Sequence, residues 1–517
     1  MCLKSVSWRV HPHAWYVTLT ERRSSYQQIL RATSIIGLAS GINIVFQILR
    51  VKVLAVLLGP GGMGLFGLFQ SIMTTASSLA GMGINSSAVR QIAAARGSGD
   101  DDRVGEVTYV FCILTIILGV IGGGTVFIFR NSIARWAFDD DEYSAQVGWL
   151  AIGVFLTVAG QSLTSLLQAY RLIGAQAWLQ IWSGVLITAL AISAIAWLGK
   201  DGIILFVIVA PFIILVLAWL FARRVCLIVK QVALRSFGTE ARNLINLGFM
   251  IMVAGSLQAS ALLVIRSHIT HDLGTEATGL FQAAWGLSFV YMGFVLDAMG
   301  KDFYPQLSEG IADKEKTIQL VREQINIALL LIGPLIISMI AFAPIIVDLL
   351  YARSFRDAAP IIQWMGVGNL LKLISWPLGY VVIAHARTRL FIFLEIVWVV
   401  TFLAVGWLLG ESLGLIGIGV GFVIAYAVTL IAVFFSCRSL TDFRFDRDNL
   451  WLLLLYGTLI ASAFFSANHD LIFGYVIGGA LVLVSGAYSY HRVALMIGSD
   501  PIKLLWKKLF SSVGSGN

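Results

Sequence analysis

The chain has 517 residues, of which 58% are hydrophobic and only 12% are charged. Soluble domains carry about 25% charged residues, and the mean hydropathy of this chain is +0.86. Its formal net charge is +8. These values exclude a disordered chain, a secreted disulfide scaffold and a nucleic-acid-binding protein, and they indicate an all-α polytopic membrane protein.

Apolar stretches long enough to cross a membrane recur along almost the whole chain. A crossing helix needs about 20 mostly apolar residues. The sequence predicts about 14 such helices, at residues 33–58, 62–84, 105–129, 147–169, 174–197, 203–222, 245–267, 278–299, 323–348, 358–383, 388–410, 413–436, 450–466 and 471–489. Residues 1–28 are polar and lack the apolar core of a signal peptide, so we interpret them as a cytoplasmic leader.

The basic residues are distributed unequally between the two sets of loops. Of the 36 Lys and Arg residues, 27 fall in the loops on the side of the termini, five in the loops on the other side, and four inside predicted spans. Short cytoplasmic loops are enriched in Lys and Arg. The pattern therefore predicts that both termini face the cytoplasm.

An internal repeat links the two halves of the chain. Residues 58–66 (LGPGGMGLF) lie 215 positions before residues 273–281 (LGTEATGLF), and Leu, Gly, Gly, Leu and Phe coincide. Basic turns at Arg171 and Arg387 recur at nearly the same period. Six spans per half give both halves the same orientation, a duplicated layout that many secondary transporters share.

The repeat divides the chain into two pseudo-repeated lobes of six helices and a C-terminal addition. The expected units are a leader at 1–28, an N-terminal lobe at 29–222, a C-terminal lobe at 245–436, two further helices at 450–489 and a cytoplasmic tail at 490–517.

Charged residues inside the spans are the clearest candidates for function. A charge at mid-helix costs about 2.5–3.5 kcal/mol on insertion scales, so it normally faces a protein interior or a watery cavity. Six residues qualify: Arg50, Lys52, Arg266, Asp297, Lys372 and Glu395. The four cations outnumber the two carboxylates, which favours an acidic ligand.

Position within the span distinguishes these residues. Arg50 and Arg266 lie near one interface and could instead extend to lipid headgroups. Lys52 is nearer still to that interface, and its sequence neighbours are apolar. Lys372 lies deepest. Arg266 corresponds to position 51 in the repeat, so we expect Arg50 or Lys52 to approach it across a central cavity.

The carboxylates and the aromatic residues leave alternatives open. Asp297 and Glu395 could neutralise buried cations as structural pairs, or they could be proton or sodium sites. Four tryptophans lie in spans near the expected cavity, where they could stack on sugar rings or simply pack in the core: Trp285, Trp364, Trp376 and Trp398.

No catalytic, cofactor-binding or metal-binding motif is present. The chain has no phosphate-binding loop of the GxxxxGK[ST] type, no HExxH and no Cys/His cluster, so we expect neither an enzyme nor a bound cofactor or metal. Two acidic runs, at residues 100–102 and 446–448, match the DxD pattern of metal-dependent glycosyltransferases. Short acidic runs in loops are more often solvated turns.

Three segments resemble a known family. Residues 54–64 (LAVLLGPGGMG), residues 368–372 (GNLLK) with Pro377 to Tyr380, and Leu394-Glu395 are similar to Wzx-type lipid-linked oligosaccharide (O-antigen or polysaccharide) flippases of the MOP transporter superfamily. The resemblance covers roughly residues 29–436. It implies two lobes around a cationic cavity that opens alternately to the two sides of a bacterial cytoplasmic (inner) membrane.

The resemblance also implies the substrate and the partners. The substrate would be an undecaprenyl-diphosphate-linked oligosaccharide for surface polysaccharide or O-antigen assembly. Its diphosphate would bind the four cations, Arg50, Lys52, Arg266 and Lys372, and Asp297 and Glu395 would be candidates for coupling to H⁺ or Na⁺. Membrane lipids and the polysaccharide polymerase machinery would be its other partners.

Three other functions remain open at this point. A MATE-like exporter shares the fold, but its organic-cation substrates favour a cavity rich in carboxylates. A lipid II flippase also has two helices beyond the twelve-span core. A membrane glycosyltransferase or polymerase would need an acid or base in an outer loop, and the turn at residues 59–62 has no ionisable side chain.

Overall fold

In the computed structural model the described residues are 13–226 and 234–497, and they contain fifteen α-helices, three short 3₁₀ helices and no β-strand. The elements are α1 (His13–Ala80), α2 (Ile84–Gly97), α3 (Asp101–Ile128), α4 (Arg130–Phe138), η1 (Asp141–Tyr143), α5 (Ser144–Ala169), α6 (Ile173–Leu198), η2 (Gly199–Asp201), α7 (Gly202–Cys226), α8 (Leu234–Gly310), α9 (Lys314–Ala341), α10 (Ala343–Leu350), η3 (Arg353–Ala358), α11 (Ala359–Ala384), α12 (Thr388–Leu413), α13 (Leu415–Thr441), α14 (Arg447–His469) and α15 (Leu471–Ile497). The expected all-α membrane fold is confirmed.

The helices are long enough for a membrane protein with many crossings. Within the described part of the chain, 11 stretches could each cross a membrane. Three of them, Ala39–Ala80, Ile173–Arg223 and Phe237–Phe289, have 42, 51 and 53 residues, about twice the length of one crossing. Each is interrupted, two by a bend and one by η2. The count of fourteen crossings stays a prediction.

The two bends fall at equivalent positions of the sequence repeat. Gly59 in α1 has φ 64° and ψ −175°, and Gly274 in α8 has φ 87° and ψ 172°. A side chain is strained at such positive φ values, so glycine is required at both bends. We call the end of the bundle that carries these bends the kink end, and the end with the α11–α12 turn at Ala386 the opposite end.

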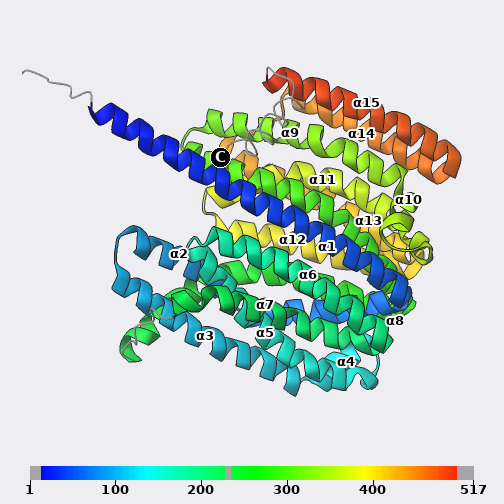
Figure 1. Cartoon of the computed structure of the whole chain (residues 1–517). Coiled ribbons are helices and arrows are strands. Elements are labelled where there is room, and N and C mark those ends of the chain that lie inside the picture. Colours follow the sequence, from blue (N-terminus) through cyan, green and yellow to red (C-terminus); the bar gives the residue numbers. More distant parts are fainter. Residues whose placement is uncertain (1–12, 227–233, 498–517) are drawn as a thin grey trace, which may run out of the picture.

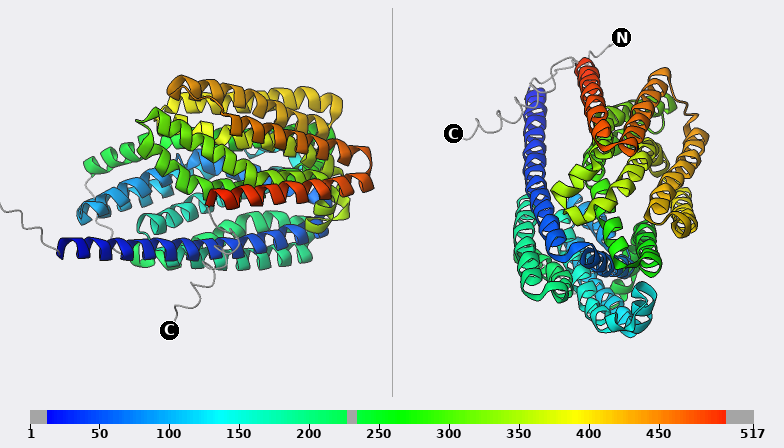
Figure 2. Two further views of the ribbon diagram at one scale, coloured as in Figure 1. Left: turned by 90° about the horizontal axis from the view of Figure 1, so that it is seen from above. Right: turned by 90° about the vertical axis from the view of Figure 1, so that its right-hand side faces the viewer.

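The helices gather into two groups (Figures 1 and 2). We call α1–α7 the N-lobe and α8–α13 the C-lobe. In the N-lobe α5 packs against α3 and α7, and α6 against α1 and α7; in the C-lobe α13 packs against α11 and α12. The long helices α1 and α8 join the lobes, and α14 and α15 pack against α9. The residue boundaries expected from the sequence stay a prediction.

The lobes are joined at one end and separate at the other. At the kink end a single apolar cluster contains residues of both lobes, among them Phe69, Ile265 and Phe422. Toward the opposite end the buried apolar residues form separate clusters. One belongs to the C-lobe with α14, around Leu373. Another lies mainly in the N-lobe, around Phe111, and a small third one lies in the N-lobe around Leu167. The shared core therefore closes the kink end.

Candidate functional site

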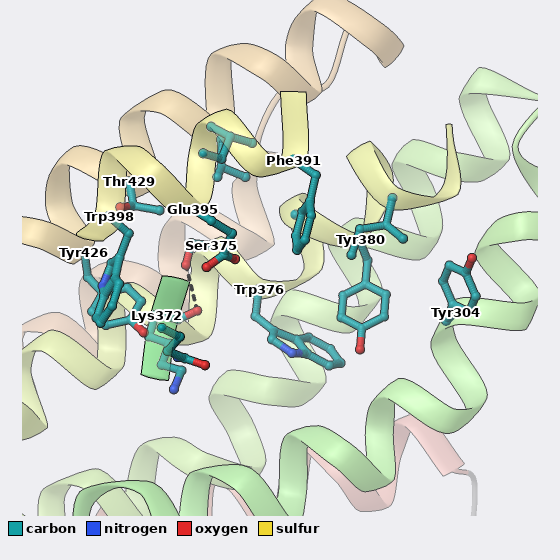
Figure 3. A pocket seen from close by; sticks show the side chains of 15 residues that line it. Tyr304, Lys372, Ser375, Trp376, Tyr380, Phe391, Glu395, Trp398, Tyr426 and Thr429 are labelled. Atoms are coloured by element: carbon teal, nitrogen blue, oxygen red, sulfur yellow. Dashed lines mark hydrogen bonds between the residues drawn. The ribbon is translucent and has the colours of Figure 1, made fainter. Parts of the chain in front are cut away.

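A cavity of about 610 Å³ lies within the C-lobe. Such a volume is ordinary for a ligand-binding site. Side chains from α8, α11, α12 and α13 line it (Figure 3), and they include Lys372, Trp376 and Tyr380 of α11 and Glu395 of α12. The cavity extends from Lys372, near the middle of α11, to Ile383 at the end of that helix. It therefore lies on the side of the opposite end.

Helical spacing explains which side chains reach the cavity. On α11 the lining residues Lys372, Trp376, Gly379 and Ile383 are separated by four, three and four positions. Residues three or four apart share one face of a helix. The sequence thus brings a cation, an aromatic ring and a glycine onto the same stripe of α11.

Lys372 carries the positive charge of this cavity. Its Nζ lies 3.8 Å from the centroid of the Phe289 ring and 5.8 Å from that of Tyr426. Both distances fit cation–π contacts, which stabilise an ammonium group away from water. Glu395 lines the same cavity and interacts electrostatically with Lys372. The cavity therefore holds one cation and one carboxylate within a wall that includes several aromatic rings.

Arg266 is buried between the lobes. Only 4% of it is exposed, and its guanidinium donates hydrogen bonds to the Gly67 carbonyl at 3.1 Å, to the Ser71 hydroxyl and to the Gln282 side chain. Gly67 and Ser71 belong to α1 of the N-lobe, while Arg266 and Gln282 belong to α8 of the C-lobe. Arg266 therefore ties the two lobes together.

Arg50 lines a second cavity, of about 300 Å³, between α1 and the C-lobe. Its guanidinium lies 5.9 Å from the centroid of the Phe206 ring. Gln282 lines the same cavity, so Arg50 and Arg266 share a neighbour. Lys52 turns to the kink end instead, where its Nζ donates to the Asp348 carbonyl at 2.7 Å. The apolar sequence neighbours of Lys52 gave no sign of this acceptor.

The structure does not bring the four candidate cations into one site. Lys372 and Glu395 share the C-lobe cavity. Arg50 and Arg266 both lie beside Gln282. Lys52 donates a hydrogen bond to a backbone carbonyl of α10. The side chain of Asp297 lies outside those that the structure describes. The proposed role of all six residues in binding or coupling stays a prediction.

The four candidate tryptophans separate into two kinds. Trp376 and Trp398 line the C-lobe cavity. Trp285 packs among Phe281, Phe289, Phe402 and Phe422, and Trp364 packs on Phe464. Only the first pair is available to a ligand in this cavity.

Several lining residues were missed at the level of the sequence. Tyr380 and Gly379 face the cavity beside Trp376, and Tyr304 reaches it from α8. The spacing of Tyr380 and Gly379 from Lys372 is helical, so marking one face of the predicted span would have identified them. Tyr304 lies 68 positions before Lys372 in the sequence and had no such signal.

An ion pair lies at the kink end, between Asp348 of α10 and Arg356 of η3. The Arg356 Nε donates to the Asp348 carboxylate at 3.0 Å. This bond holds the pKa of the Asp348 carboxyl below its ordinary value, with smaller help from the charges of Arg353 and Lys52. Among the described residues no cluster of three metal-binding side chains occurs.

Comparisons with known proteins identify the family of this chain. The profile of the polysaccharide biosynthesis protein family matches residues 53–360. The chain belongs to this family. Within the curated proteins it is similar to the lipid III flippase of Escherichia coli (strain K12), with 23% identity over 350 residues, 67% of this chain and 82% of the relative. The lipid III flippase of Shigella flexneri matches equally.

Solved structures of the MOP superfamily share the fold of this chain. The lipid II flippase MurJ in an inward closed conformation has a TM-score of 0.66 at 14% identity, covering 89% of this chain and 99% of that one. A multidrug resistance MATE family transporter in an inward-facing conformation has a TM-score of 0.64 at 18% identity, covering 80% and 96%. The expected MOP-like fold is confirmed.

Proposed function

We propose that this protein is a flippase that moves a polyprenyl-diphosphate-linked oligosaccharide across the bacterial cytoplasmic membrane by alternating access. The product would enter surface polysaccharide or O-antigen assembly, where polymerase machinery would consume it. Two facts support the substrate class. The chain belongs to a polysaccharide biosynthesis family, and a relative covered over most of its length is a lipid III flippase.

The observation that carries the proposal is the lysine in the C-lobe cavity. A diphosphate needs charge-assisted hydrogen bonds to replace its water, and the Lys372 ammonium offers three donors. Keeping that charge at mid-membrane costs about 2.5–3.5 kcal/mol, which the rings of Phe289 and Tyr426 help to offset. A diphosphate at Lys372 would bring the opposite charge to the same ammonium group.

The arrangement of the lobes supports entry of the substrate from the cytoplasm. The bias of Lys and Arg assigns the opposite end to that side. The shared core and Arg266 close the kink end, while the cavity extends toward the opposite end. The head group would bind in this state, the polyprenyl tail would stay among membrane lipids, and rocking of the lobes would then expose the cavity to the outside.

Glu395 is the candidate for ion coupling in this scheme. Its carboxylate lines the cavity that holds Lys372, so a diphosphate at Lys372 would repel it. Uptake of H⁺ or Na⁺ by Glu395 would relieve the repulsion and link the ion to the substrate. Asp297 remains a second candidate of the same kind.

A glycosyltransferase is the less favoured alternative, because its two candidate acidic motifs have structural roles. The Asp100 carboxylate accepts a hydrogen bond from the Arg103 backbone N–H at 3.0 Å, and the Asp446 carboxylate accepts one from that of Asn449 at 2.7 Å. Both residues cap the start of a helix, which satisfies backbone groups that would otherwise be unpaired.

Mass spectrometry of the lipid that co-purifies with the full chain tests the substrate class. We expect a polyprenyl diphosphate that carries sugars, enriched over the membrane average. Enrichment of an organic cation instead would favour the MATE-like exporter and contradict the proposal.

The Lys372→Ala variant tests the residue that carries the proposal. We expect loss of lipid retention and of surface polysaccharide, with normal membrane insertion. Lys372→Arg should keep part of both, because the charge survives while its geometry changes. Lys314→Ala is the control, since Lys314 pairs with Asp442 on the surface and surface pairs contribute little. Unchanged lipid retention by Lys372→Ala would contradict the site.

A further inference from the structure

The part of the C-lobe cavity beyond Lys372 has the chemistry of a sugar-binding surface. Trp376, Tyr380 and Tyr304 follow Lys372 toward the opposite end. The ring centroids of Trp376 and Tyr380 are 4.5 Å apart, and those of Tyr380 and Tyr304 are 5.8 Å apart (Figure 3). Such rings combine an apolar face with a polar group at the edge, which matches the C–H face and the hydroxyls of a sugar.

Trp376 and Tyr380, which we call the aromatic wall, pack against α8 on the side away from the cavity. Trp376 and Tyr380 both pack on Phe303 of α8, which is 3% exposed. A Cβ atom added at Gly300 of α8 would lie 3.0 Å from the Tyr380 hydroxyl and 3.1 Å from the Trp376 ring. Close packing therefore fixes the two rings on the side of α8, and their other side borders the cavity.

Gly379 keeps the space in front of this wall empty. It lines the cavity between Trp376 and Tyr380, and a Cβ atom built there would meet nothing within 4 Å. Its φ is not in the left-handed region. Glycine inside a helix costs about 1 kcal/mol relative to alanine, so nothing in this conformation favours glycine for stability. The missing side chain leaves room for a ligand.

The same cavity contains a buried hydrogen-bond donor that has no acceptor among the described residues. This donor is the indole Nε1 of Trp398, which lines the cavity beside Glu395. Buried donors are normally paired. A ligand that brings an oxygen to this N–H would satisfy it.

We propose that Trp376, Tyr380 and Tyr304 bind the sugar units adjoining the diphosphate, and that Gly379 determines which of them fit. This subsite rests on the proposed function. From Lys372 to Tyr380 the axis of α11 rises by about 12 Å, so the diphosphate at Lys372 and the first sugars lie along one helix face. The subsite would thus recognise the end of the oligosaccharide that adjoins the diphosphate.

The test compares two lipids that differ only in the sugar. The full chain in nanodiscs is titrated with undecaprenyl diphosphate and with undecaprenyl diphosphate carrying one N-acetylglucosamine. Wild type should bind the second lipid roughly tenfold more tightly. Gly379→Leu should remove this preference, because its side chain fills the sugar space, while binding of the bare diphosphate stays. Gly379→Ala should keep most of the preference, and Trp376→Ala should lose it.

Gly457→Leu is the matched control. Gly457 lies on α14, outside the cavity, and a Cβ atom there also meets nothing within 4 Å. It should retain the preference and the thermal midpoint. Wild-type discrimination in Gly379→Leu, or equal loss of both lipids, would overturn the sugar subsite while leaving the flippase intact. If Lys372→Ala binds both lipids as wild type does, the proposed function itself fails.

Discussion

Gly64 of α1 and Gly279 of α8 face each other where the two helices cross, and they hold equivalent positions in the sequence repeat. A Cβ atom at Gly64 would lie 3.0 Å from the Gly279 nitrogen, and one at Gly279 would lie 3.0 Å from the Gly64 nitrogen. Each added atom would also overlap a backbone carbonyl, that of Thr275 or of Pro60. The two copies of the repeat therefore contact each other symmetrically at the kink end. This close contact requires glycine at both positions.

Gly64→Ala and Gly279→Ala should each prevent full closure of the kink end. The added methyl group has only backbone to displace, and overpacking of this kind costs about 1–3 kcal/mol or more. We expect reduced transport and greater accessibility of a cysteine placed at Thr278, which is fully buried at the closed kink end, read by a thiol reagent in purified protein.

Gly61→Ala is the control for these variants. A Cβ atom at Gly61 would lie 3.6 Å from the Glu276 side chain and 3.7 Å from the Thr275 hydroxyl, which are ordinary contacts. Its transport should remain near that of wild type. Normal closure in Gly64→Ala would mean that the crossing opens and closes without the glycine contact.

Arg266→Ala should destabilise the ligand-free protein. The Gly67 carbonyl, the Ser71 hydroxyl and the Gln282 side chain would lose their donor, and each unsatisfied buried group costs about 1–3 kcal/mol. The lobes would also separate more readily at the kink end. We expect a lower thermal midpoint together with faster labelling of the same Thr278 cysteine.

Thr125→Ala serves as the comparison for Arg266→Ala. The exposed Thr125 hydroxyl donates to the Ile121 carbonyl of its own helix, at 2.8 Å, so its loss should change neither the thermal midpoint nor the labelling rate. A higher midpoint for Arg266→Ala would instead indicate that Arg266 is destabilised by repulsion from neighbouring cations.

The repeat and the hydropathy pattern predicted much of this fold, because both are local signals. Gly59 and Gly274 could be paired from their spacing, and both have the positive φ that only glycine adopts freely. The partners of the charged residues could not be found in this way. Arg266 bonds residues 195 and 199 positions away, and Lys52 bonds a backbone carbonyl, a group that every residue carries.

The cavity residues also divide into those that local sequence patterns indicate and those whose role depends on the packing of distant helices. Lys372 was selected for its depth in a span, and helical spacing explains Trp376 and Tyr380 beside it. Helical spacing also places Gly379 on this face, but the sequence does not show that Gly379 faces open space, because a glycine in a close helix contact looks the same in the sequence. Only the packing of α8, α11, α12 and α13 separates the two cases.

Acid should weaken the contact between Asp348 and Arg356. The hydrogen bond from Arg356 lowers the pKa of Asp348, so the charged pair contributes stability above the unfolded pKa of about 3.9. That contribution is lost as the pH falls through the lower folded pKa. The thermal midpoint of wild type should exceed that of Asp348→Asn at neutral pH, and the difference should shrink below about pH 4.

Arg356→Gln provides the reciprocal measurement for this pair. It should lose the same pH-dependent advantage, because the bond needs both residues. A midpoint difference that persists unchanged to pH 3 would show that Asp348 acts through another partner.

Two exposed arginines at opposite ends of the bundle test the predicted orientation. Arg353 begins η3 at the kink end, and Arg387 lies in the α11–α12 turn at the opposite end. The charge bias predicts that the kink end faces outward. In a variant without native cysteines, an impermeant thiol reagent should label a cysteine at Arg353 in intact cells but not one at Arg387. Permeabilised cells should label both. Labelling of the Arg387 cysteine in intact cells would mean that the orientation is the reverse of the predicted one. Substrate entry through the C-lobe cavity would then begin outside the cell.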